Sequence, residues 1–247
     1  MISTSKIATR RRRALLSLAV GLVAAGLAST ASAALVTYDF TGHVNEVIDG
    51  QLFSLNGTIA LGPSSVATGS FTYDTDTPGT LVPQGFKNYF DAIKSFSLTV
   101  ESGSNTLSWN PPVGLMTTDI NMFNDSIGLP APDVFSGRVG QMPATNLTLP
   151  PGATLSSSAE FVAAINLGGP TTLFNDQSLP PSLDLSAFTW HAIRLFPQVP
   201  GQAPNPADGA LRIELALLTL SPVPEPGTLA LLSLGLAGLA ASRRRKQ

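Results

Sequence analysis

The 247-residue sequence contains no cysteine, only two histidines and few charged side chains, which make up 12% of its residues. The absence of cysteine excludes a disulfide framework, a thiolate metal site and a thiol nucleophile. A chain without disulfides depends on a hydrophobic core for its stability, and 43% of these residues are hydrophobic. We therefore expect one packed domain.

Basic side chains are scarce in the middle of the chain. Residues 34–222 contain fifteen Asp and Glu but only five basic residues, a formal charge of about −10. These five are Lys87, Lys94, Arg138, Arg194 and Arg212. The other basic residues lie near the two ends of the chain, so the net charge of the whole sequence is only −2. An acidic domain repels nucleic acid, which excludes nucleic-acid binding as its function.

The amino-terminal segment has the pattern of a secretory signal peptide. Five basic residues between positions 6 and 13 precede an apolar stretch at 14–28. The small residues Ala31 and Ala33 predict cleavage by signal peptidase just before Ala34. We expect export through the Sec translocon, with twin-arginine export as the alternative because of the arginine run.

The carboxyl-terminal segment combines three signals. Val223, Pro224, Glu225 and Pro226 form a stretch in which the prolines favour an extended backbone. The apolar run 229–241 would span about 20 Å as a single hydrophobic helix, against roughly 30 Å for a bilayer core. Basic residues at 243–246 would keep the end of the chain in the cytoplasm. These signals predict a transient anchor in the inner membrane.

This tail resembles the PEP-CTERM tail of bacterial surface and secreted proteins, whose motif matches Pro224, Glu225 and Pro226. The resemblance implies that an exosortase, a membrane enzyme similar to transpeptidases, processes the chain at Val223 to Pro226. It also implies a Gram-negative bacterium that makes exopolysaccharide. An ordinary single-span anchor is the alternative.

Between the two ends, apolar residues recur with period two, and Gly and Pro interrupt them every ten to fifteen residues or so. The predicted strands are 36–47, 65–73, 92–101, 106–109, 119–123, 134–139, 159–167, 188–196 and 211–220. We predict an all-β fold, an antiparallel β-sandwich of about eight to ten strands, jelly-roll or Ig-like, with a closed sheet as the alternative. The domains are then a signal peptide at 1–33, an extracytoplasmic body at 34–221 and a sorting signal at 222–247.

Few residues in the body suggest a binding site. Asp74 and Asp76 in a turn are weak candidates for calcium, which prefers carboxylate and carbonyl oxygens, and we otherwise expect no metal or cofactor. Trp109 and Trp190 are weak candidates for flat platforms that stack on sugar rings. His43 and His191 belong to no catalytic motif, and each fits a strand histidine whose hydrogen bonds are satisfied.

No residue pattern predicts catalysis, so we expect a non-enzymatic protein that is displayed on the cell surface or secreted. Its expected role is structural, in association with exopolysaccharide in a biofilm matrix. A carbohydrate-binding module is the alternative, followed by a secreted hydrolase whose paired carboxylates a sequence cannot reveal.

Overall fold

The computed structural model describes residues 35–125, 132–141, 143–202 and 205–221, which lie within one compact unit, Ala34–Val223. These residues are all-β, as predicted, and contain no α-helix. Their two 3₁₀ turns are η1 (Leu185–Ala187) and η2 (Pro206–Asp208). The predicted signal peptide with its cleavage site, the sorting motif and the hydrophobic helix lie outside the described residues.

All nine predicted strands are confirmed, with small shifts at their ends. They are β1 (Leu35–Ile48), β3 (Gly62–Asp74), β6 (Ile93–Ser102), β7 (Asn105–Trp109), β8 (Thr117–Phe123), β9 (Asp133–Gln141), β12 (Glu160–Gly169), β13 (Trp190–Gln198) and β14 (Ala210–Ser221). Five shorter strands were not predicted: β2 (Phe53–Ser54), β4 (Thr80–Leu81), β5 (Lys87–Phe90), β10 (Leu147–Thr148) and β11 (Thr154–Leu155). The two-residue strands are too short to show a period of two, and β5 does not alternate, since its buried residues Asn88 and Tyr89 are adjacent.

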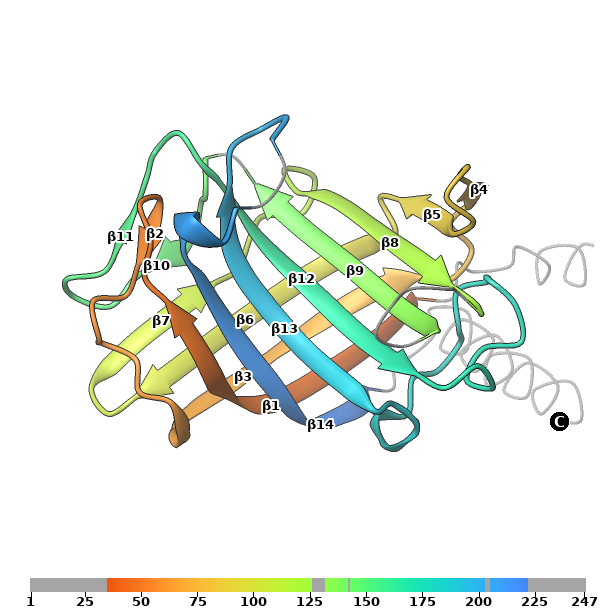
Figure 1. The fold of residues 1–247 in the computed structure, drawn as a ribbon, viewed down its shortest axis with the longest axis horizontal. Coiled ribbons are helices and arrows are strands. Elements are labelled where there is room, and N and C mark those ends of the chain that lie inside the picture. The colour runs from red at the N-terminus through yellow and green to blue at the C-terminus, as the bar shows by residue number, and fades with distance from the viewer. Residues whose placement is uncertain (1–34, 126–131, 142, 203–204, 222–247) are drawn as a thin grey trace, which may run out of the picture. The chain divides into compact units, whose positions relative to one another are not determined.

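Twelve of the strands form one antiparallel sheet in the order β10-β7-β6-β3-β1-β14-β13-β12-β9-β8-β5-β4, and β11 pairs separately with β2. The sheet curls on itself, so that β8, β9, β12, β13 and β14 form one layer and β3, β6 and β7 lie behind them (Figure 1). The body therefore differs from the predicted sandwich in two ways. It has more strands, and a single sheet, continuous through β1 and β14, supplies both layers.

The sheet bends where β1 pairs with β14. Their register shifts between Thr41 and Gly42 and again between Val44 and Glu46, as expected of β-bulges. A Cβ atom at Gly42 would lie 2.3 Å from the carbonyl oxygen of Glu214, so only glycine allows the two backbones to approach this closely. The bulges and the close approach let β1 pass from one layer to the other.

Aromatic rings fill the space between the layers. The ring of Trp109 on β7 lies 5.0 Å from that of Phe161 on β12, and Tyr73 on β3 lies 5.6 Å from Phe135 on β9. All four side chains are fully buried. Because each pair joins strands of opposite layers, these contacts hold the curled sheet together.

Replacement of Trp109 by alanine tests this role. Loss of a fully buried tryptophan should lower the free energy of unfolding by about 3–5 kcal/mol, because transfer energy is lost and a cavity remains. Urea denaturation of the purified body would measure the change. Phe90→Ala is the matched control, since Phe90 is 67% exposed, and it should change stability by less than about 0.5 kcal/mol. Equal losses in both variants would contradict the assignment.

Candidate functional site

A row of amide and hydroxyl side chains crosses the outer face of the layer that contains β8, β9 and β12. The sheet register aligns Asn88, Asn121, Ser136 and Asn166 on four neighbouring strands. The Asn88 amide nitrogen donates a hydrogen bond to Oδ1 of Asn121 (2.7 Å), and the Ser136 hydroxyl donates to Oδ1 of Asn166 (2.8 Å). The outer face of this layer is therefore polar, whereas its inner face forms the core.

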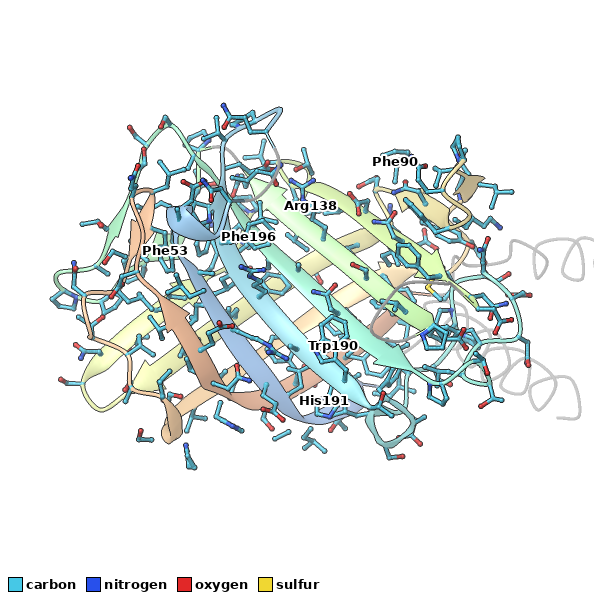
Figure 2. All side chains as sticks on the ribbon, viewed as in Figure 1. Phe53, Phe90, Arg138, Trp190, His191 and Phe196 are labelled. Atoms are coloured by element: carbon cyan, nitrogen blue, oxygen red, sulfur yellow. The ribbon has the colours of Figure 1, made fainter. Side chains whose placement is uncertain are left out.

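Arg138 is the centre of a second polar group on this face (Figure 2). Its guanidinium donates to Oε1 of Gln198 (2.6 Å) and to Oε2 of Glu160 (3.4 Å). Oε1 of Glu160 also accepts a hydrogen bond from the Thr117 hydroxyl (2.8 Å). The cluster links β8, β9, β12 and β13 through hydrogen bonds among its own side chains.

Asp119 lies opposite Arg138 in the pairing of β8 with β9. Burial raises the pKa of the Asp119 carboxyl, while the nearby Arg138 charge and the hydrogen bond from Asn121 lower it by a smaller amount. Sequence reasoning did not single out this group, because its members are far apart in the chain and belong to no motif.

The outward side of β13 carries Trp190, Arg194 and Phe196, all partly exposed. The Arg194 guanidinium carbon lies 5.7 Å from the Phe196 ring centre, within the range of a cation–π contact. Trp190 and Phe196 are six residues apart on the strand, about 20 Å, so the two rings cannot stack on one sugar. Both residues are labelled in Figure 2. Trp190 is therefore a single exposed ring beside polar side chains.

The prediction of a sugar platform is wrong for Trp109. This residue has no exposed surface, and its ring packs edge-on against Phe96 and Phe161. Tryptophan is large and apolar, so the same residue type serves equally well in a core or on a surface. The sequence pattern could not separate the two environments.

Asp74 and Asp76 lie at the turn after β3. Oδ1 of Asp74 accepts a hydrogen bond from the Asp76 backbone amide (3.0 Å), which is the geometry of an Asx turn. Across the described part of the chain, no group of three or more His, Cys, Asp or Glu could hold a metal ion. Calcium binding at this turn stays a prediction that rests on two carboxylates.

The two histidines lie on β1 and β13, the strands on either side of β14, and His191 adjoins Ala192, which pairs with Glu214. His43 is on β1 opposite Glu214. His191, on β13, lines a hollow of about 360 Å³, and its Nδ1 atom is buried without a hydrogen-bond partner. His191 is thus a strand residue as predicted, but its hydrogen bonding is incomplete.

One wall of this hollow belongs to the loop of residues 170–189 between β12 and β13. The Tyr73 hydroxyl donates to the carbonyl of Pro180 (2.6 Å), and the Asp133 carboxylate accepts from the amides of Leu173 (3.0 Å) and Phe174 (2.9 Å). Asp184, Leu185 and Ser186 of the loop face Ala216, Leu217 and Leu218 of β14 across the hollow. Buried side chains of the body therefore fix the loop that shapes it.

β14 ends at Ser221, and the next residues carry the most specific signal in the chain. Residues 222–246 match the family model of the PEP-CTERM protein-sorting motif. The chain carries a PEP-CTERM sorting signal. This finding confirms the resemblance, and the motif implies export, a transient membrane anchor and processing by an exosortase.

No curated protein and no solved structure matches the chain. Within the part that the structure describes, no helix has the length and hydropathy of a membrane span. The PEP-CTERM match covers residues 222–246, the sorting tail, and not the body.

Asp119→Asn tests the electrostatics of the outer face. Burial raises the pKa of Asp119 above its unfolded value, so its contribution to stability is full below about pH 4 and is lost as the pH rises through the folded pKa. The variant does not ionise there. Its urea midpoint should rise relative to wild type between pH 4 and pH 7. Asp76→Asn, at an exposed position, serves as control, and a pH-independent difference between wild type and Asp119→Asn would contradict the assignment.

Proposed function

We propose that the exported body is a non-enzymatic structural component of the cell surface or of an exopolysaccharide matrix, delivered there when an exosortase removes the tail. The observation that carries the proposal is the PEP-CTERM motif, which begins directly after the last residue of β14. The body's formal charge of about −10 adds support, because an acidic domain stays soluble outside the cell.

The environment of the acidic side chains favours a non-enzymatic role. Glu160 accepts hydrogen bonds from Thr117 and Arg138, and Asp119 accepts a hydrogen bond from Asn121. The hollow beside β14 contains one carboxylate, Asp184, which accepts hydrogen bonds from Ser186. Paired catalytic carboxylates would instead face a shared space for substrate. The described residues therefore offer structural uses for these groups.

Glycan binding on the outer face of β13 is a second candidate function. Trp190 exposes part of its ring there, and the polar row with Ser136 and Asn166 lies on the same face of the neighbouring strands. An aromatic ring presents an apolar face, and nearby amides and hydroxyls can bond sugar hydroxyls. This arrangement would suit weak contacts with a polysaccharide.

Mass spectrometry of the protein from the cell envelope and the medium tests the sorting step. The mature wild-type chain should begin at Ala34 and lack the apolar run 229–241, whereas Glu225→Ala should keep its tail through Lys246. Glu101→Ala is the control, since Glu101 is an exposed acid on β6 outside the motif, and it should be processed normally. Persistence of the intact tail in the mature wild-type protein would contradict the proposal.

Cosedimentation with exopolysaccharide purified from the producing strain tests the second candidate. Trp190→Ala should weaken binding by about tenfold or more, which corresponds to about 1.4 kcal/mol. Phe90→Ala removes another partly exposed ring, from β5 at the far side of the layer, and should bind like wild type. Equal binding by wild type and both variants would contradict glycan binding at Trp190 but would not bear on the structural role in the matrix.

A further inference from the structure

The last half of β14 has a ladder partner on only one side. β1 pairs with β14 from Ala210 to Ser221, whereas β13 pairs with it only from Leu211 to Glu214. In the strand ladders of the described chain, no other strand pairs with residues 216–221. We call this stretch the free edge of β14. Its side away from β1 presents backbone amides and carbonyls that a further strand could use.

The composition of the free edge lacks the usual protection against strand pairing. Residues 216–221 read ALLTLS, without a charge, a proline or a glycine. Leu217 is 53% exposed and Leu220 is 49% exposed. Edge strands that stay unpaired in native proteins are blunted by charges, prolines or bulges that twist the strand away. The bulge on β14 lies before Leu217, so the exposed leucines continue beyond it.

The hollow lined by His191 adjoins this free edge. Ala192 pairs with Glu214, so a strand added along residues 216–221 would follow the same side of β14 on which β13 begins. It would meet His191, Leu185 and Ser186, which face Leu217 across the hollow. In strand addition, backbone hydrogen bonds supply affinity and pockets for side chains supply specificity. The free edge offers backbone groups for hydrogen bonds, and the hollow offers a pocket for a side chain.

The chain itself brings a partner to this place. Glu225 lies four positions after Ser221, a span of at most about 14 Å in a fully extended chain. An enzyme that holds Glu225 in its active site must therefore contact the end of β14 or detach it from β1. Detachment would break the pairing that places the buried Tyr38 opposite Leu220, whereas contact with the intact strand leaves that pairing in place.

We propose that the free edge and its hollow are a docking site for the exosortase, an inference that rests on the proposed function. An extended segment of the enzyme pairs with residues 216–221 and places an apolar side chain in the hollow, while the active site holds the sorting motif. Asp39, Asp184 and Glu214 are exposed around the site, so basic residues should flank the docking segment of the enzyme.

The test follows removal of the tail from the full-length chain by pulse-chase in cells that make the exosortase. Leu217→Lys places a charge in the edge and hollow and should slow processing by about tenfold. Leu81→Lys is the matched control, because Leu81 is an exposed leucine in β4 at the end of the same sheet, and it should be processed at the wild-type rate. Equal rates for Leu217→Lys and wild type would overturn the docking site.

A spacer variant keeps the test independent of any folding defect. Six Gly and Ser residues inserted between Ser221 and Pro222 leave the body unchanged but move it up to about 20 Å from the motif. If the body docks, the spacer should slow processing several-fold, whereas an unchanged or faster rate would overturn the proposal. A wild-type chain that keeps its tail would refute the sorting function itself, and normal wild-type processing with no effect of either variant would refute only the docking site.

Discussion

The packing of aromatic rings between the two halves of one curled sheet is the contact on which the rest of this structure depends. The chain has no disulfide, and Trp109 with Phe161 and Tyr73 with Phe135 join strands from opposite layers. These rings meet because the sheet curls, and the β1–β14 pairing has two register shifts there, one of them at Gly42, where the two backbones approach closely. Core and bend therefore require each other: the bend brings the rings together, and their burial stabilises the bend.

The curl also decides what the surface offers. It directs one side of each strand into the core and leaves the other side for the polar row and the Arg138 cluster. Because the pairing of β13 with β14 starts at Ala192 and Glu214, the end of β14 keeps one edge without a ladder partner. The loop of residues 170–189, held by Tyr73 and Asp133, completes the hollow beside that edge. The curl of the sheet thus produces both the buried core and the exposed edge of β14.

The sorting signal and the folded body are different segments of the chain, and one follows the other directly. The PEP-CTERM match begins at residue 222, directly after the last residue of β14. Because this connection is short, an enzyme that processes the tail must either work close to the folded sheet or detach the end of β14 from β1. A longer linker would free the enzyme from any contact with the sheet. The body is therefore part of the surroundings in which its own tail is recognised.

The sequence by itself determined the sorting tail, the all-β class and the nine longer strands, because a tail motif and a period of two are local patterns. Only the tertiary structure decided which tryptophan is buried, since the local sequence around Trp109 is compatible with either face of a strand. It also decided the contact of Arg138 with Gln198, sixty residues away, and the partial pairing of β14. These features depend on strand register and on the curl of the sheet, which arise from long-range packing that no local pattern encodes.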